Sequence, residues 1–571
     1  MGLSYRSFGA ALIITVLSSP WAGAANVEYV EAQPLSKAIQ AGAKPVAAGT
    51  LKLPVITWGA DAVPILANGG PTTQAGSPFA NEKLNFEIFK EDDFTKQLQG
   101  YVEGRTPFLR GTLGMVNQAA ELLGRSPGLE PVVIYQLSWS SGGDQMVVRP
   151  GVERPKDLQG KTIVLQRYGP HVDYLDRILK DAGLSFSDVT VKWVRELTIP
   201  ATKSAAAVDP ASAMRADAGV GAVMVITPDA LALTSGGTVG TGAEDSVKGA
   251  KVLLTTKTAD RVIADVYAVR RDWFDAHRAE VQAFAHALFL SEERLSGLMA
   301  EKAKRKAEYD KAMQACASIL LGSPQATADV EGLLGDGTLV GYAGNVAFFG
   351  DTEVRNFSRM TRDIQDALVK LNLLSKPVAL AQAKWEYGDL AAGLKDTGGV
   401  AAPRFATSKV EQKLAERAKS NDQQGVLFEF EIRFQPNQSD FPTAQYAKDF
   451  ERAVEMAATY GGAIVEIVGH SDPLQYLKQQ KTGASPDVLK RVEQSNKNLS
   501  LSRANGVRDS ILRYAREKGY TLDPSQFAVA GYGFSKAVFP NPQTEDQWRA
   551  NMRVTFRVIS VEAELTEFQA Q

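Results

Sequence analysis

The sequence predicts a large α/β region built as two lobes, followed by a smaller α+β domain. From residue 50 to residue 394, short β-branched and aromatic runs alternate with amphipathic helical patterns, which is typical of an α/β fold with mostly parallel sheets. A region of this length is more than one hydrophobic core usually covers, so we expect two lobes. Residues 395–424 begin with turn-forming residues and predict a linker to a second unit, which spans residues 425–560.

The elements of the large region follow from local periodicity. Strands are expected where Val, Ile, Tyr and Trp gather between turn residues, and helices where apolar residues recur every three or four positions. The expected strands are residues 53–59, 131–139, 162–169, 190–194 and 222–227, and the expected helices include 94–104, 172–182 and 279–303.

The smaller unit shows fewer elements in a different order. Its expected strands are residues 427–434, 463–468, 527–531 and 552–559, and its expected helices are 444–460 and 501–514. On the second helix, Leu501, Ala504, Val507, Ile511 and Tyr514 fall on one face, which must cover a sheet. Arg503 and Arg508 are expected outside that face, and residues 561–571 are expected to form a tail.

The first 24 residues predict a cleaved secretory signal. Arg6 precedes an apolar run from Phe8 to Leu17, Pro20 breaks the run, and small residues at 22–24 suit a signal peptidase. The run is too short for a bilayer that needs about twenty residues, although a retained anchor is the alternative. Residues 25–49 lack periodicity and predict a loose leader. We expect a soluble mature protein in the periplasm.

Composition excludes several classes of function. The 63 Lys and Arg residues do not exceed the 65 Asp and Glu residues, so nucleic acid is not expected as a partner. Cys316 is the single cysteine and is expected as a buried thiol. The four histidines lack metal-ligand spacing, and no Walker loop or nucleophile elbow is present. We therefore expect no metal, no cofactor and no catalytic residue.

Four motifs in the C-terminal unit occur in a characteristic order. They are Gly469-His470-Ser471-Asp472, Asn496-x-x-Leu499-Ser500-x-x-Arg503-Ala504, Val529-x-Gly531-x-Gly533 and Asn551-x-Arg553-Val554. In these motifs the unit resembles the OmpA-like peptidoglycan-binding domain.

The resemblance implies binding of the diaminopimelate residue of the peptidoglycan stem peptide. Asp472 would accept hydrogen bonds from the ammonium of that ligand, and the Arg503 fork would hold its carboxylate. By the same resemblance, Asn496 and Arg553 contribute further contacts. The alternative is that Asp472 only stabilises a turn and that Arg503 is a solvated helix residue.

The sequence departs from the OmpA-like pattern in two places. Residues 473–495 are longer than the usual turn and predict an extra helix beginning near Ser485 and Pro486. Met552 stands where the family has the first of two arginines. Arg549 is the nearest possible substitute for that cation, although its register differs.

The large region carries a different set of motifs. They are Trp139 to Val148 with the core Ser-Ser-Gly-Gly-Asp, Asp157-Leu-Gln-Gly-Lys161, Tyr168-Gly169-Pro170-His171 before a helix, and Val225 to Ala230. In these segments residues 50–394 resemble periplasmic solute-binding proteins of the nitrate, sulfonate and taurine type of ABC transporters.

This second resemblance implies a solute cleft between the lobes, at the C-terminal ends of the strands. Backbone N–H groups at Gly169 to His171 would suit an anionic head group. The expected solute-binding residues are Trp58, Ser141, Asp144, Tyr168, Gly169 and His171. The alternative places Trp58 in the core and gives His171 only a role at the helix start.

Together the two units predict a periplasmic, non-catalytic binding protein that is anchored non-covalently to peptidoglycan, close to the outer membrane. Its partners would be a small solute and an ABC permease, and its role would be transport or sensing. The alternative is a cell-envelope scaffold whose binding-protein module docks another protein. An enzyme of the cell wall would need a carboxylate or nucleophile constellation that the motifs do not provide.

Overall fold

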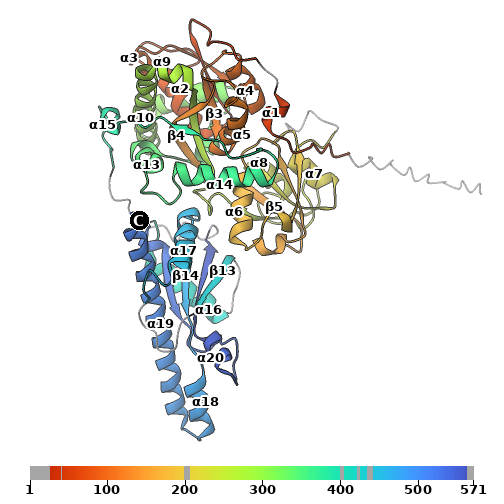
Figure 1. Cartoon of the computed structure of the whole chain (residues 1–571), viewed down its shortest axis with the longest axis vertical. Coiled ribbons are helices and arrows are strands. Elements are labelled where there is room, and N and C mark those ends of the chain that lie inside the picture. The colour runs from red at the N-terminus through yellow and green to blue at the C-terminus, as the bar shows by residue number, and fades with distance from the viewer. Residues whose placement is uncertain are drawn as a thin grey trace, which may run out of the picture.

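A computed structural model describes residues 26–39, 42–198, 206–398, 404–420, 425–433 and 441–561. The expected signal peptide, and the expected tail beyond Val561, lie outside these ranges. Figure 1 shows two lobes beside each other and a C-terminal domain below them, from which the helices α18 and α19 extend furthest. Within the described residues, no helix has both the length and the apolar character that crossing a bilayer requires.

The first lobe is built on a mixed sheet with an aromatic core. Phe284 packs against the rings of Phe79, Phe86, Phe108 and Tyr267. The sheet runs in the order β11 (Gly337–Leu339), β4 (Pro131–Ser140), β10 (Ala264–Arg270) and β3 (Phe108–Thr112), with β12 (Ala381–Gln382) beside β4. A parallel pair is formed by β1 (Leu51–Val55) and β2 (Phe86–Lys90). The long helix α10 (Arg278–Ala300) and α2 (Ala62–Asn68) pack on this lobe and on each other.

The second lobe has a five-stranded sheet. Its order is β7 (Thr190–Val194), β6 (Thr162–Gln166), β8 (Val220–Ile226), β5 (Asp144–Val148) and β9 (Lys251–Thr255). The sheets are less parallel than the sequence predicts. β10 lies antiparallel between β3 and β4, and β5 lies antiparallel between β8 and β9. These are the strands that enter each sheet after the chain crosses from the other lobe, and they run against their new neighbours.

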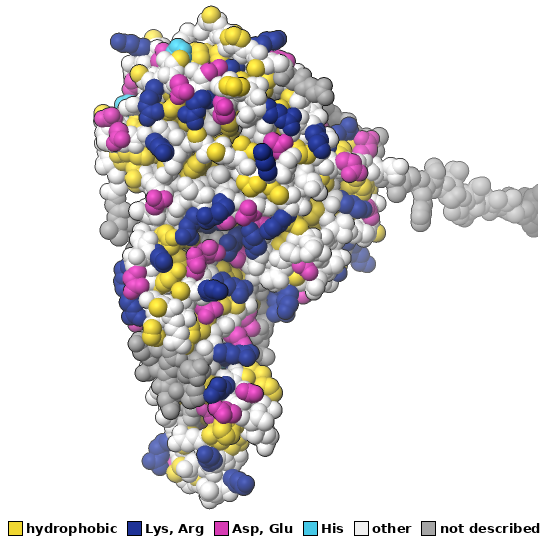
Figure 2. Space-filling model, in the orientation of Figure 1, with side chains coloured by type: hydrophobic (Ala, Val, Ile, Leu, Met, Phe, Trp, Pro, Cys, Tyr) yellow, Lys and Arg dark blue, Asp and Glu magenta, His cyan; other side chains and the backbone are white. Residues whose placement is uncertain are grey.

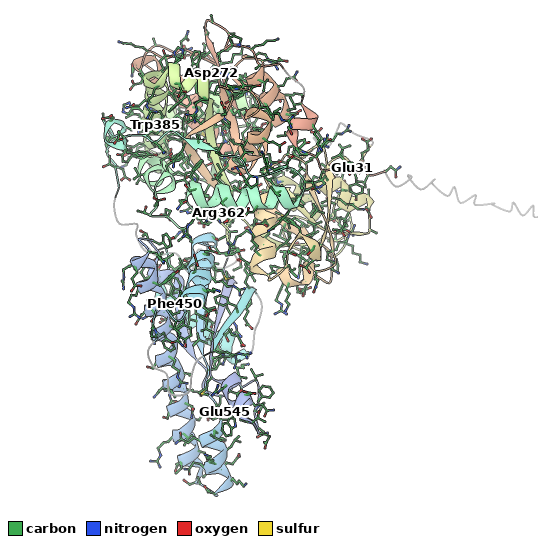
Figure 3. All side chains as sticks on the ribbon, in the orientation of Figure 1. Glu31, Asp272, Arg362, Trp385, Phe450 and Glu545 are labelled. Carbon is green, nitrogen blue, oxygen red and sulfur yellow. The ribbon has the colours of Figure 1, made fainter. Side chains whose placement is uncertain are left out.

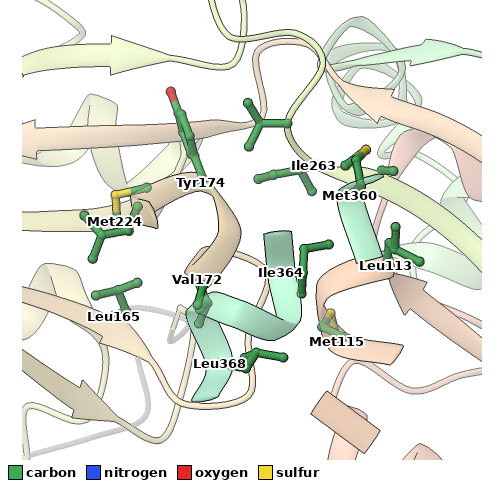
Figure 4. Packing of buried hydrophobic residues seen from close by; sticks show 14 of the residues in the cluster. Leu113, Met115, Leu165, Val172, Tyr174, Met224, Ile263, Met360, Ile364 and Leu368 are labelled. Atoms are coloured by element: carbon green, nitrogen blue, oxygen red, sulfur yellow. The ribbon is translucent and has the colours of Figure 1, made fainter. Parts of the chain in front are cut away.

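Three helices close the seam between the lobes. They are α5 (Leu113–Leu123) from the first lobe, α6 (Val172–Asp181) from the second and α14 (Phe357–Lys370), which packs on both. Figure 4 shows their apolar side chains facing one another, with Leu113 and Met115 on α5, Val172 and Tyr174 on α6, and Met360, Ile364 and Leu368 on α14. One continuous apolar cluster therefore joins the two lobes.

Residues 26–39, part of the segment expected as a loose leader, bind both lobes. On the second lobe, the Val30 amide donates to the Trp193 carbonyl at 2.9 Å, and the Tyr29 hydroxyl donates to Asp217 at 2.8 Å. On the first lobe, the short helix α1 (Leu35–Ala38) packs on α5, and the Ser36 hydroxyl donates to Glu121 at 2.9 Å. We call these residues the N-terminal strap. Figure 3 shows Glu31 of the strap at the edge of the second lobe.

The C-terminal domain is one four-stranded sheet with helices on both faces. The strand order is β13 (Val426–Arg433), β16 (Arg553–Ser560), β14 (Ala463–Gly469) and β15 (Phe527–Gly531). Helices α17 (Ala447–Thr459) and α19 (Pro486–Glu517) cover one face. Helix α16 (Thr407–Ser420) buries Val410 and Leu414 against the other face, so this part of the expected linker belongs to the domain.

Helix α19 is longer than predicted, and its buried face differs from the predicted one. It begins at Pro486, after Ser485, as predicted, but it is one 32-residue helix that also contains the predicted helix 501–514. Ala504, Val507 and Ile511 are buried as expected. Leu501, however, is 39% exposed and Arg503 only 7% exposed, so the buried face is rotated from the predicted one toward Ser500 and Arg503.

The C-terminal domain docks on the second crossing between the lobes, residues 256–263. The Gly462 amide donates to the Thr258 carbonyl at 3.2 Å, and Arg404 pairs with Asp260 at 2.6 Å. Nearby, the Tyr460 hydroxyl donates to Asp181 of α6 at 2.8 Å. Figure 2 shows basic and acidic side chains side by side at this junction, and Figure 3 shows Arg362 on α14 above the domain and Phe450 within it.

Candidate functional sites

The four C-terminal motifs meet at one end of the sheet, where β14 and β15 end against α19. The Ser471 amide donates to the Gly533 carbonyl at 2.9 Å, and the Gly533 amide donates to the Ser500 hydroxyl at 2.9 Å. A Cβ atom on Gly469 would overlap the Ser500 carbonyl, and one on Gly531 would lie against the helix backbone. The motif glycines are therefore needed because the helix backbone lies directly on the strand ends.

Replacing Gly469 by alanine is expected to destabilise the C-terminal domain by about 1–3 kcal/mol, because the added methyl group must push α19 away from β14. Chemical denaturation of the full chain measures this. Gly332 is the matched control, since it lies in helix α12 (Thr327–Gly335) with open space around its Cβ position. Alanine there is expected to be neutral or stabilising by up to about 1 kcal/mol. Equal stability of the two variants would contradict the close approach.

Asp472 and Arg503 lie near each other without forming an ion pair. Asp472 accepts a hydrogen bond from the Leu474 amide at 2.9 Å. Among the described residues, the Arg503 guanidinium has no carboxylate within ion-pair distance, and its Nε is buried without a hydrogen-bond partner. Burial lowers the pKa of Arg503, and the nearby Asp472 charge opposes that shift. A carboxylate and a largely buried guanidinium thus lie near each other, and neither forms an ion pair with a described residue.

The other predicted wall-binding residues lie on α19 and at the start of β16. Asn496 lies on the same face of α19 as Ser500 and Arg503 and is 9% exposed, with its Nδ2 donating to the Val492 carbonyl at 2.9 Å. Arg553 begins β16 next to His470, whose amide donates to the Arg553 carbonyl at 2.9 Å. The Arg553 side chain pairs with Glu431 at 3.3 Å and keeps Nη1 buried without a partner among the described residues.

The departures from the OmpA-like pattern have structural consequences. Met552 is 8% exposed and ends helix α20 (Glu545–Asn551), so the side chain at the position where that pattern has an arginine is buried. Arg549 pairs with Glu545 at 2.6 Å on the surface. The insertion forms helix α18 (Leu474–Lys481) and the first turns of α19, which pack as a hairpin beside the site. Burial and the Arg553 and Arg557 charges lower the pKa of His470 to about 3, so this imidazole is neutral.

The structure brings most of the predicted solute-binding residues to the first crossing between the lobes, residues 141–143. Asp144 accepts from the Ser140 hydroxyl at 2.6 Å, and its other oxygen lies 2.7 Å from His171 Nε2. The Trp58 indole donates to Ser138 at 2.9 Å, and its ring lies so close to Gly143 that a Cβ there would come within 2.6 Å.

A segment that the motifs do not include covers this crossing. The Ser141 amide donates to the Asp336 carbonyl at 2.8 Å, and the Ser141 hydroxyl lies 2.7 Å from that of Thr338. A Cβ on Gly59 would overlap the Leu333 carbonyl. Residues 332–339 therefore pack over the crossing at Trp58 and Ser141. A separate cavity of about 300 Å³ lies in the first lobe, bordered by β4, residues 346–350 and residues 382–387.

Tyr168 and Gly169 make hydrogen bonds to other parts of the protein fold. Tyr168 adopts a left-handed backbone, with φ of 67°, and its hydroxyl donates to the Gln33 carbonyl of the N-terminal strap at 2.9 Å. The Gly169 carbonyl accepts from Gln118 Nε2 at 3.3 Å. These two residues thus connect the strap, the second lobe and α5 of the first lobe.

Several buried charged groups were not found from the sequence, and Asp173 and Arg110 are two of them. Asp173 is 6% exposed, and burial raises its pKa to about 7 against the opposing effects of Arg355 and of two backbone amides. Arg110 is fully buried between Asp61 and Asp265. The available signals were a charge within the apolar run FLRGTLG and an acid in the first turn of an apolar helix. Both patterns also fit solvated residues.

Cys316 is buried in helix α11 (Lys306–Leu320), and burial raises the pKa of its thiol to about 12. Among the described residues, no group of three or more His, Cys, Asp or Glu side chains is arranged to hold a metal ion.

The fold is a two-lobed α/β module joined to an α+β domain. Residues 79–291 match the family model described as NMT1/THI5 like. No curated protein sequence matches the chain.

Solved structures similar to this chain include the periplasmic aliphatic sulphonate binding protein of Escherichia coli, at 15% identity, 58% of this chain, 90% of that chain and a TM-score of 0.37. A second is the alkanesulfonate-binding protein of Xanthomonas axonopodis pv. citri bound to MOPS, at 17% identity, 58% of this chain, 97% of that chain and a TM-score of 0.36. A third is a desulfurization enzyme, at 17% identity, 60% of this chain, 98% of that chain and a TM-score of 0.36.

Proposed function

We propose that this is a non-catalytic periplasmic binding protein that holds peptidoglycan non-covalently through its C-terminal domain. The observation that carries the proposal is the unpaired couple of Asp472 and Arg503 at the end of β14. Diaminopimelate carries an ammonium and a carboxylate on one carbon, so it complements a fixed anion beside a fixed cation. Asn496 on α19 and Arg553 at the start of β16 supply further polar contacts. The protein would lie at the cell wall, close to the outer membrane.

The proposal is tested by retention of the full chain on isolated sacculi. Asp472→Ala and Arg503→Ala are each expected to weaken retention about tenfold or more, because each removes a charge-assisted contact of about 1.5–3 kcal/mol. Arg508→Ala is the matched control, since Arg508 lies on the same helix and, among the described residues, its side chain bonds to the neighbouring Asp509 alone. Free diaminopimelate should displace the unmodified chain. Equal retention of all three variants would remove Asp472 and Arg503 from the proposed site.

For the two-lobed module, we propose capture of a small solute at the seam between the lobes, for ABC transport through a permease or for sensing. This part of the proposal is supported by the family-model match over residues 79–291, which includes Ser141, Asp144 and His171. It is also supported by the meeting of these side chains at the first crossing between the lobes.

A scaffold role is the second candidate, and a specific observation favours it. Residues 332–339 pack over the crossing, while the N-terminal strap, α14 and the C-terminal domain all hold the lobes together. A module held in this way could dock a protein partner instead of a solute. Native mass spectrometry of the purified full chain separates the two roles: a co-purified small molecule supports capture, and its reproducible absence supports the scaffold.

A further inference from the structure

The proposed solute site contains a buried carboxylate that none of its motifs explains. Asp173 lies in the first turn of α6, where the Asp173 and Tyr174 amides are near enough to lower the pKa of its carboxyl, but neither side-chain oxygen makes a hydrogen bond of full geometry with a described residue. An unsatisfied buried carboxylate costs free energy, and native structures rarely keep one without a reason. A ligand that donates hydrogen bonds is such a reason.

The Asp173 carboxylate lies at the starts of two helices. Asp173 Oδ1 lies 3.4 Å from the place where a Cβ on Gly114 would stand, so the carboxylate faces the start of α5 as well as the start of its own helix. Helix starts attract anions through free N–H groups and the helix dipole. The Asp173 carboxylate therefore places a negative charge of the protein itself at the helix starts, where the anionic head group of a solute would otherwise be held.

Further unpaired atoms near Asp173 are acceptors. Gln118 lies one helical turn after Gly114 on α5, and its Oε1 is buried without a partner among the described residues. His171 Nε2 lies 2.7 Å from Asp144. His171 Nδ1 is also buried without a described partner, and it is an acceptor in the tautomer whose Nε2 donates to Asp144.

Arg355 and Asp144 act on the charge of Asp173 in opposite directions. Asp144 adds a second negative charge, whose influence raises the pKa of Asp173. Arg355 is the nearby cation, but its Nε donates to the Arg261 carbonyl at 3.1 Å and its Nη1 pairs with Asp363 at 3.4 Å.

We infer that Asp173 determines the specificity of the seam between the lobes, which takes a small solute with a primary ammonium group and excludes sulfonates and other anions. The inference rests on the proposed solute capture and names its ligand class. A primary ammonium has three N–H donors and no acceptor, which complements the two Asp173 oxygens and Gln118 Oε1. A sulfonate offers only acceptors and would add a negative charge beside Asp173 and Asp144.

The test compares ethylammonium with ethanesulfonate, two probes that share a tail and differ in head group. Thermal unfolding and titration calorimetry of the full chain at constant ionic strength are expected to show binding of ethylammonium and none of ethanesulfonate. Asp173→Asn, which keeps the side-chain shape, is expected to weaken ethylammonium binding at least about tenfold, as expected for a lost charge-assisted pair. Asp366→Asn is the control, since Asp366 is exposed on α14.

Three outcomes overturn the inference. The first is stabilisation of the unmodified chain by ethanesulfonate, which contradicts the ligand class but leaves solute capture standing. The second is unchanged ethylammonium binding by Asp173→Asn, which places the ammonium site elsewhere. The third is no response to either probe. In that case native mass spectrometry decides separately whether the proposed capture of some other solute survives.

Discussion

Replacing Arg110 by methionine is expected to destabilise the full chain by about 3–5 kcal/mol, because it leaves two buried carboxylates without their shared cation. The guanidinium is fully buried, bonds to Asp61 at 2.7 Å through Nη2, and bonds to Asp265 at 2.9 Å through Nη1. Asp265 also accepts from Ser138, which accepts from Trp58. The destabilisation is therefore expected to extend to the first crossing between the lobes, where Trp58 lies.

The loss is expected to depend on pH. Burial raises the pKa of Asp61 to about 7 and raises that of Asp265, while Arg110 opposes both shifts. Without Arg110 both values rise further, so the folded variant binds more protons than the unfolded chain. The free energy of unfolding of the variant then falls as the pH rises from about 4, the pKa of an aspartate carboxyl in the unfolded chain, through the pKa in the folded state. The deficit of the variant should be smaller at pH 5 than at pH 8.

Urea denaturation at the two pH values measures the effect. The matched control is Lys306→Met, because Lys306 pairs with Asp310 at 2.6 Å on the surface, with both side chains exposed. That pair is expected to contribute about 0.3–0.5 kcal/mol. A deficit for Arg110→Met no larger than that of the control, or one that grows as pH falls, would contradict the buried-charge account.

Replacing Asp181 by alanine is expected to uncouple the C-terminal domain from the lobes, with a loss of about 3 kcal/mol. Asp181 is 4% exposed and accepts from Arg177 Nε at 2.6 Å and from the Tyr460 hydroxyl at 2.8 Å. Its removal leaves the Arg177 guanidinium buried, with Glu455 at 3.4 Å as its remaining carboxylate.

Scanning calorimetry of the full chain checks this uncoupling, because a docked domain unfolds together with the lobes and an uncoupled one unfolds in a separate transition. Tyr460→Phe is the graded control. It removes one hydroxyl from the same network and is expected to lose about 1 kcal/mol with no second transition. Coincident unfolding of the Asp181→Ala variant would show that the apolar contacts of the interface suffice by themselves.

The sequence predicted the order of the elements well, because that order depends on local periodicity. The predicted helix 172–182 is α6, ending at Asp181, and the predicted extra helix begins at Pro486. The ordered motifs also indicated which residues would meet, since each lies at the end of a strand or on one helix face. Arg503 was nevertheless placed outside the buried face, because residues 501–514 alone do not show how α19 rotates against the sheet.

What the sequence by itself determined is therefore the α/β region, the smaller α+β domain and the position of their polar motifs. Only the tertiary structure decided that residues 26–39 bind both lobes, that residues 332–339 cover the first crossing, and that Arg110 and Asp173 are buried. The physical reason is sequence separation. Arg110 meets Asp265 across 155 positions and Asp181 meets Tyr460 across 279, and no local pattern records such pairs. A charged side chain in an apolar run has the same local pattern whether water or a distant partner satisfies it.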